Sequence, residues 1–169
     1  MIQKTLVLIK PDAVKRGIAG EIISRFEKVG LKIIAMKFAC PGTVIAKEHY
    51  DYDDIAIRHG KQVWERLIKF ITSGPVIPIV LEGDFAIDVV RKIIGSTEPL
   101  KALPGTIRGD FAHHSYALTD KHNTSLHNII HASASFEDAD REIKVWFPMS
   151  NNLELCNYKR DDSGEHIFK

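Results

Sequence analysis

The sequence lacks the common glycine-rich motifs that bind phosphates. It contains no G-x-x-x-x-G-K-[ST] loop, no G-x-G-x-x-G turn, and neither the H-R-D nor the D-F-G motif of protein kinases. These absences argue against P-loop enzymes, dinucleotide-binding βαβ units and protein kinases. If the protein binds phosphates, side chains scattered along the chain must hold them.

The sequence is also poor in cysteine, in long apolar runs and in net charge. Its two cysteines, Cys40 and Cys156, match no metal or redox spacing, and the apolar runs are far too short to cross a bilayer. Basic residues number 23 and acidic residues 22, which gives a net charge of +1 and no global basic field for nucleic acid. We therefore expect a cytoplasmic protein without a disulfide scaffold or membrane span, and no nucleic-acid partner.

The length of 169 residues suits one domain, which we place at residues 1–169 with a charged C-terminal tail from about residue 148. Short apolar runs predict strands, and apolar residues at helical spacing predict helices. Strands are expected at residues 5–9, 31–38, 76–81 and 129–130. Helices are expected at residues 19–29, within 44–71 with an interruption, at 86–94 and at 135–145.

This order of elements predicts an α+β protein with a ferredoxin-like βαββαβ sandwich. We expect a four-stranded antiparallel sheet with helices on one face. A doubly wound parallel sheet is the alternative, but no glycine-rich turn follows the first strand. Residues 95–128 lack periodicity, and an ordered loop of this length is typical of a functional segment.

Candidate chemical groups lie at the ends of the predicted elements. His131 follows two β-branched residues in Asn128-Ile-Ile-His131, as expected for an imidazole that points into a cleft from a short strand. Lys10, Arg91 and Arg108 could grip phosphate oxygens, and arginine can do so with two parallel hydrogen bonds. Each cation alone is more typical of a solvated surface, so their significance depends on their combination.

Together, these segments resemble one family. Four motifs occur in the order found in nucleoside diphosphate kinases: Lys10-Pro-Asp, Ser73-Gly-Pro-Val76, Pro104-Gly-Thr-Ile-Arg-Gly-Asp-Phe111 and Asn128-Ile-Ile-His131-Ala-Ser. Three further segments are similar to the family: Arg25-Phe-Glu-Lys-Val-Gly30, Lys47-Glu-His-Tyr50 and Arg141-Glu-Ile-Lys-Val-Trp-Phe147. The resemblance covers residues 5–147 and implies the ferredoxin-like fold.

The resemblance also implies an activity. Members of the family transfer the γ-phosphate of a nucleoside triphosphate, mainly ATP, to nucleoside diphosphates through a phosphohistidine in a ping-pong cycle. His131 matches the nucleophile, Glu142 the carboxylate that orients it, and Ser133 a serine beside it. Further residues match the phosphate and sugar contacts and a tyrosine beside the lysine: Lys10, Arg91, Thr97, Arg108, Asn128 and Tyr50. Mg²⁺ would arrive on the nucleotide phosphates, with no ligand from a protein side chain.

Three features depart from the family pattern. Ala132-Ser133-Ala134 stands where many members have Gly-Ser-Asp, and Ala134 removes a carboxylate. This motivates an alternative function, a catalytically impaired nucleotide-binding regulatory protein of the same fold. Two loops, at 51–62 and 112–127, are longer than usual. The residue that contacts the base is therefore hard to place: Val63 and its neighbour Trp64 are candidates, although Trp64 also suits the core.

The second long loop contains several histidines: His113, His114, His122 and His127. Their spacing matches no common zinc site, so we expect the loop to alter the subunit interface or the rim of the active site. The resemblance implies a homo-oligomer, a hexamer or a tetramer.

Overall fold

The protein is built around a four-stranded antiparallel sheet. The computed structural model describes residues 1–148, and the expected tail from about residue 148 falls almost wholly outside this part. The strands are β1 (Ile2–Ile9), β2 (Lys32–Met36), β3 (Ile77–Asp84) and β4 (Ile130–Ala132), in the order β2-β3-β1-β4. The predicted α+β class and four-stranded antiparallel sheet are confirmed.

Helices cover both faces of this sheet, which corrects the expectation of helices on one face alone. Val7 and Ile9 of β1 point into a core with Ile22 and Val90, whereas Leu6 and Leu8 point into a second core. Successive side chains of a strand alternate between faces, so a continuous apolar run indicates burial on both sides. The run at residues 5–9 carried this information.

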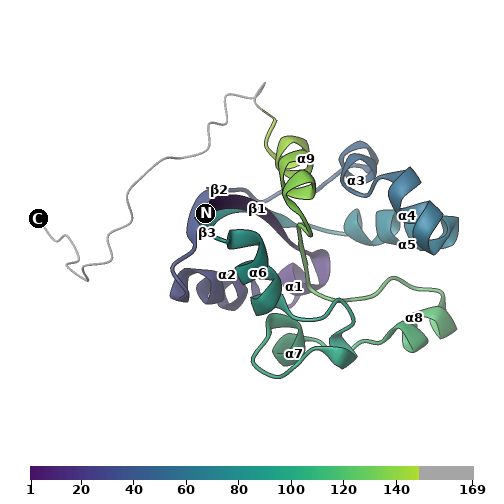
Figure 1. Ribbon diagram of the computed structural model, residues 1–169. Helices are drawn as coiled ribbons and strands as arrows, with labels where there is room; N and C mark the ends of the chain where they lie inside the picture. The colour runs from purple at the N-terminus through teal and green to yellow at the C-terminus, as the bar shows by residue number, and fades with distance from the viewer. Residues whose placement is uncertain (149–169) are drawn as a thin grey trace, which may run out of the picture.

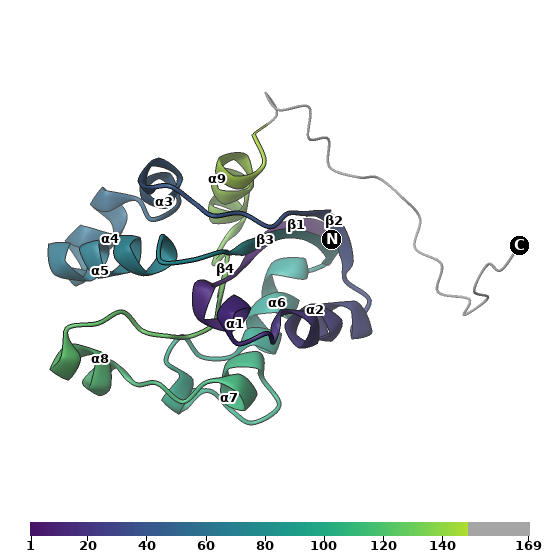
Figure 2. The same cartoon turned by 180° about the vertical axis from the view of Figure 1, so that it is seen from behind.

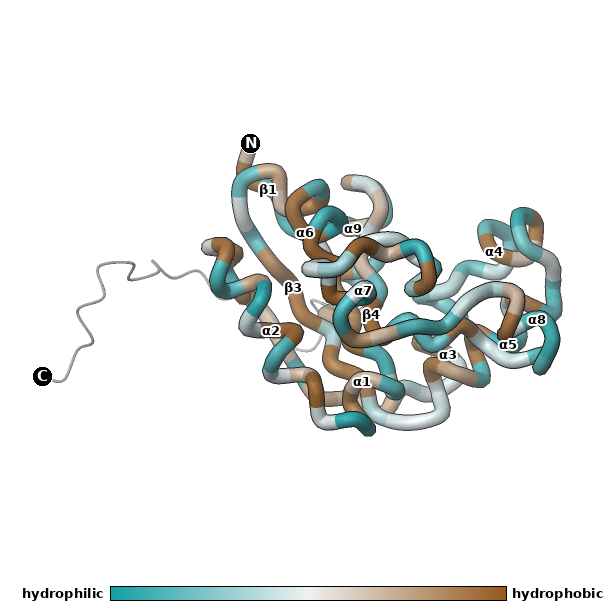
Figure 3. Tube along the Cα trace, turned by 90° about the horizontal axis from the view of Figure 1, so that it is seen from below, coloured by the Kyte–Doolittle hydropathy of each residue, from teal (hydrophilic) through white to brown (hydrophobic). Residues whose placement is uncertain are grey.

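The first core is covered by α2 (Ala19–Lys28) and α6 (Ala86–Ile94), with α1 (Pro11–Lys15) beside them. Hydrophobic and hydrophilic residues alternate along α2 (Figure 3), as expected for a helix that packs one of its own faces against the sheet. Pro11 occupies the first turn of α1, where its missing N–H costs no helical hydrogen bond.

The second core lies under α3 (Thr43–His49), α5 (Lys61–Ile71) and α9 (Phe136–Trp146). Figure 1 shows α3 and α9 on the side of the sheet opposite α2 and α6. The helical region expected within residues 44–71 is interrupted before α4 (Tyr52–His59). The Asp51 side chain caps α4 by accepting from the Asp54 N–H. In the described residues, no helix is long and apolar enough to span a bilayer.

The segment without periodicity contains three short helical pieces, which are η1 (Pro99–Lys101), α7 (Ile107–Phe111) and α8 (Tyr116–His122). Capping side chains hold α7 and α8, because Thr106 Oγ1 accepts from the Gly109 N–H and Ser115 Oγ accepts from the Leu118 N–H. Glu98 accepts from the Tyr116 N–H at 2.9 Å and so anchors the start of α8. Elements of one turn or two are too short for hydrophobic periodicity to reveal them.

We predict that Leu8→Ala lowers the free energy of unfolding by about 2–5 kcal/mol, because it opens a cavity beneath α9 in a fully buried part of β1. Urea unfolding followed by tryptophan fluorescence measures this change. Ile2→Ala is the matched control, since Ile2 lies on the same strand but is 70% exposed. It should cost less than about 0.5 kcal/mol. Equal losses in the two variants would contradict the two-core description.

Candidate active site

His131 lies in β4, opposite Leu8 of β1, and lines a cavity of about 740 Å³. The cavity is bordered by residues of α4, α5 and α8 and by the end of β1. Its lining brings together most of the residues that the sequence selected: Lys10, Tyr50, Val63, Arg91, Thr97, Arg108, Asn128 and His131. These positions are spread over more than 120 residues of sequence, and the fold gathers them at one end of the sheet.

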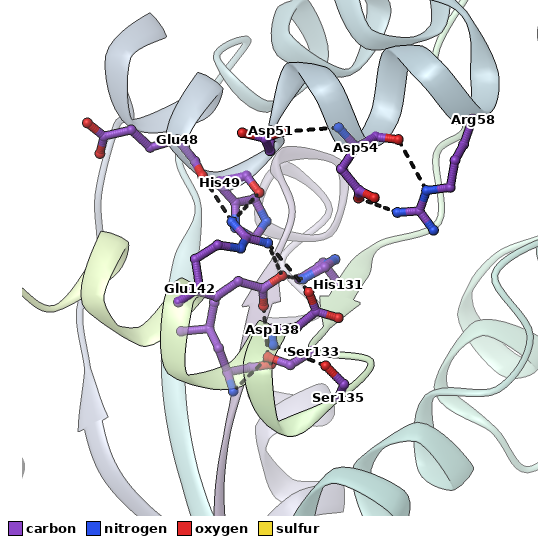
Figure 4. A network of polar contacts seen from close by, with 12 residues as sticks. Glu48, His49, Asp51, Asp54, Arg58, His131, Ser133, Ser135, Asp138 and Glu142 are labelled. Carbon is purple, nitrogen blue, oxygen red and sulfur yellow. Dashed lines mark hydrogen bonds and ion pairs between the residues drawn. The ribbon is translucent and has the colours of Figure 1, made fainter.

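Glu142 fixes the orientation of the His131 ring. His131 Nε2 lies 2.8 Å from Glu142 Oε1, and the other carboxylate oxygen accepts from Ser133 Oγ at 2.8 Å (Figure 4). An ionised carboxylate can only accept, so Nε2 carries the ring proton. Nδ1 therefore keeps its lone pair and is the nitrogen available for bond formation.

Glu142 stays ionised although it is only 3% exposed. Burial acts to raise its pKa, but the positive charge that His131 and His49 would carry when protonated, with the hydrogen bonds from His131 and Ser133, lowers the pKa of Glu142 to about 2. Ser133 is fully buried and also receives the Leu6 N–H at 3.2 Å, so β1 holds it in place. Ser133 thus supports Glu142 from behind the site.

His49 packs directly against His131, with the two ring centroids 4.6 Å apart. Its Nδ1 accepts from the Trp146 indole at 3.2 Å, so its proton is on Nε2. Burial, followed by the charge of His131, places the pKa of His49 well below its usual value, so this ring stays neutral. Arg141 holds the end of α3 by donating to the backbone carbonyls of Glu48 and His49.

His49, His131 and Glu142 also form a group whose ligand atoms lie within 4.8 Å of one another, which could hold a metal ion. However, His131 Nε2 and both oxygens of Glu142 already engage one another and Ser133. A metal there would remove the hydrogen bond that orients the His131 ring. We therefore interpret this group as the orienting device of His131. His49 lies in the segment Lys47-Glu-His-Tyr50, and no local sequence pattern marks a buried neutral histidine.

Lys10 is 5% exposed and donates to Asn128 Oδ1 at 2.7 Å. Asn128 in turn donates to the Thr97 carbonyl at 2.9 Å, so three residues expected at the phosphates form one chain. Burial and then the charge of Arg108 lower the pKa of Lys10 to about 8, although Asp12 acts in the opposite direction. A cation with a lowered pKa gains stability when an anion binds beside it.

Arg108 is held almost entirely by backbone carbonyl groups. Its guanidinium donates to Asn128 at 3.2 Å, to Gly95 at 2.9 Å and to Ile130 at 2.7 Å. Burial and then the charge of Arg91 lower its pKa to about 10. No carboxylate neutralises Arg108 in these contacts, so the guanidinium remains an uncompensated positive charge at the cavity.

The turn that carries Arg108 requires glycine at position 109. A Cβ atom there would lie 2.1 Å from the carbonyl oxygen of Leu103. Directly after Asn128, Ile129 has a φ of 60°, a conformation that is costly for a β-branched residue. This conformation lets the Asn128 carbonyl accept from both Ile130 N–H and Arg108. The strained backbone thus lies between Asn128 and His131.

The two candidates for the base contact, Val63 and Trp64, lie in different surroundings. Val63 lines the cavity, but Trp64 does not. The Trp64 indole donates to the Tyr50 carbonyl at 2.7 Å and packs on the second core, which fits the expectation that Trp64 suits the core. Helical geometry explains this difference, because adjacent residues on α5 face directions about 100° apart.

Two histidines of the second long loop, His114 and His127, stack on each other. His114 and His127 have centroids 4.9 Å apart at an interplanar angle of 7°, and Phe70 stacks on the other side of His127 at 4.7 Å. Among residues 1–148, they do not form a group able to hold a metal. They attach the loop to α5 instead. Arg66 of α5 and several α8 residues also line the cavity, which sequence reasoning missed.

Comparisons with known proteins agree with this geometry. The sequence model of the family described as nucleoside diphosphate kinase matches residues 3–152. The chain belongs to this family. It is 51% identical over 168 residues to nucleoside diphosphate kinase of Borreliella burgdorferi, covering 99% of each chain, and 46% identical over 155 residues to the Pyrococcus furiosus protein, covering 92% of this chain and 89% of that one.

Solved structures give the same result. The transition-state mimic of the Borrelia burgdorferi kinase with bound vanadate and ADP superimposes with a TM-score of 0.91, at 51% identity, and covers 99% of this chain and 98% of that chain. An NDP kinase from Pyrobaculum aerophilum superimposes with a TM-score of 0.82 at 36% identity, covering 91% of this chain and all of that one. The ferredoxin-like expectation is thus confirmed by structural neighbours of the family.

We predict that ADP affinity falls as the pH rises through about 8. The free protein then loses the proton of Lys10 and with it a positive charge at the cavity. The fall should approach at most about tenfold per pH unit, the limit for one linked proton. Equilibrium dialysis of ADP between pH 7 and 9.5 measures it.

Two variants separate Lys10 from other ionisations. Lys10→Met should bind ADP more weakly at pH 7 and show no further loss through pH 8. Lys4→Met, on the exposed part of the same strand, should retain the pH dependence of the unmodified protein. A pH dependence that survives in Lys10→Met would contradict this assignment.

Proposed function

We propose that this protein is a nucleoside diphosphate kinase that phosphorylates itself on His131 and then transfers the phosphoryl group to a nucleoside diphosphate. The donor is a nucleoside triphosphate, mainly ATP. The observation that carries the proposal is the bond between His131 Nε2 and Glu142, which leaves Nδ1 free at a cavity with buried cations.

The reaction needs two displacements of the same kind. The Nδ1 lone pair attacks the γ-phosphorus, an N–P bond forms, and the bond to the bridging oxygen breaks, so the diphosphate leaves with that electron pair. As Nδ1 uses its lone pair, positive charge develops on the ring, and the ionised Glu142 stabilises it. A nucleoside diphosphate then attacks the phosphohistidine by the reverse path, and neutral His131 is restored.

Phosphoryl transfer depends mostly on positioning and on charge stabilisation. Lys10, Arg91 and Arg108 would neutralise the transferred group and the leaving phosphates. Asn128 and Thr97 would position Lys10 and contact the phosphates or the sugar. Burial raises the pKa of Tyr50, so its hydroxyl stays protonated and can donate a hydrogen bond beside Lys10.

The donor set fits a Mg²⁺ ion that arrives with the nucleotide. The charged side chains on the cavity wall are Lys10, Arg66, Arg91 and Arg108, with Asp120 as the acid, so no carboxylate pair for a resident ion lines this cavity. Mg²⁺ keeps much of its water and prefers phosphate oxygens, where it would neutralise charge. The protein residues would then grip the oxygens that the ion leaves free.

The alternative of a catalytically impaired regulatory protein is not favoured. It was motivated by Ala134, but the nucleophile, its orienting carboxylate and the cations do not depend on that position. Assembly as a hexamer or tetramer and a cytoplasmic location stay predictions.

We predict that incubation with γ-labelled ATP gives an acid-labile phosphoenzyme, and that GDP discharges it to labelled GTP. His131→Gln should give neither product, because glutamine lacks the nucleophilic nitrogen. His122→Gln is the matched control, since His122 ends α8 and does not line the cavity. Absence of label in folded, ADP-binding wild-type protein would overturn the proposed activity.

A further inference from the structure

The base-contact position expected from the family, Val63, offers only a small aliphatic side chain, and the adjacent Trp64 points into the core. The cavity wall around Val63 is formed by Arg66 and Leu67 as well. Residues three and four positions apart lie on the same face of a helix. Arg66 therefore occupies the α5 face where a nucleoside would have to lie once its phosphates reach Lys10 and Arg108.

The guanidinium of Arg66 is fixed in place by α8 and the residues that follow it. Nη1 donates to the carbonyls of Thr124 at 3.1 Å and Thr119 at 3.4 Å, and Nη2 lies 3.5 Å from Asp120 Oδ1. The side chain is 18% exposed, and its Nε is buried without a hydrogen-bond partner. Carbonyl groups at the end of a helix favour a cation, which explains why the side chain reaches there.

A second contact joins α5 to the segment that contains α8. Phe70 of α5 stacks on His127 at 4.7 Å, and His127 stacks on His114. The α5 face and the α8 segment are therefore joined at two places, and the cavity lies between residues of both. Arg66 thus has a fixed position as well as a place on the cavity wall.

We propose that Arg66 is the platform on which the nucleotide base stacks. Hydrogen bonds of a guanidinium lie in its plane, so the contacts with α8 do not use its faces, and the side chain borders the cavity. A guanidinium plane can stack on a base, and such stacking tolerates every base because each has a π-face. The inference rests on the proposed function, and it assigns the nucleoside contact to an arginine in place of an aromatic residue.

The test compares ligands that share phosphates but differ in their base. Arg66→Met should weaken ADP binding about tenfold or more, weaken CDP binding less because its ring is smaller, and leave pyrophosphate binding unchanged. Arg66→Lys should not restore ADP binding, since lysine retains the charge but lacks the plane. Equilibrium dialysis with each ligand gives these affinities without any need for turnover.

Arg58→Met is the matched control. Arg58 lies on α4, pairs with Asp54 of its own helix and does not line the cavity, so ADP affinity should not change. Unchanged ADP binding in Arg66→Met, or equal losses for ADP and pyrophosphate, would overturn the inference. Full rescue by Arg66→Lys would overturn it as well. Failure of phosphoenzyme formation would instead contradict the proposed function, because these binding measurements do not depend on transfer.

Discussion

The hydrogen bond between His131 Nε2 and Glu142 is the interaction on which the rest of the site depends. It decides which ring nitrogen carries the proton, and so which one keeps its lone pair at the cavity. The bond joins β4 to α9, and Ser133 connects it to β1 through Leu6. The sheet and α9 therefore together hold His131.

Burial holds the cations of the site in place, but it also raises the free energy of their charged forms. Lys10 and Arg108 lie almost out of contact with water, and their pKa values are lowered because the charged forms are desolvated. Backbone carbonyls and the Asn128 side chain satisfy their donors without neutralising their charge. The cavity is thus prepared for an anion, and a bound polyphosphate supplies the negative charge that the protein does not.

Much of this arrangement could be predicted from the sequence. The strands follow from apolar runs, and the residues gathered at the cavity follow from the family motifs. The second layer of helices was missed, although the run at residues 5–9 predicts burial on both faces. His49 and Arg66 were missed for another reason: their roles come from contacts across 82 and 53 residues of sequence, with His131 and Thr119, and no local pattern encodes such contacts.

The most direct test of this account is to determine which nitrogen of His131 carries the phosphoryl group. Nitrogen-15 and phosphorus-31 NMR of the phosphorylated, histidine-labelled protein distinguishes the two isomers. The account predicts phosphorylation at Nδ1, with Nε2 still protonated and bonded to Glu142. Phosphorylation at Nε2 would contradict it, because the ring would have to leave the carboxylate that orients it.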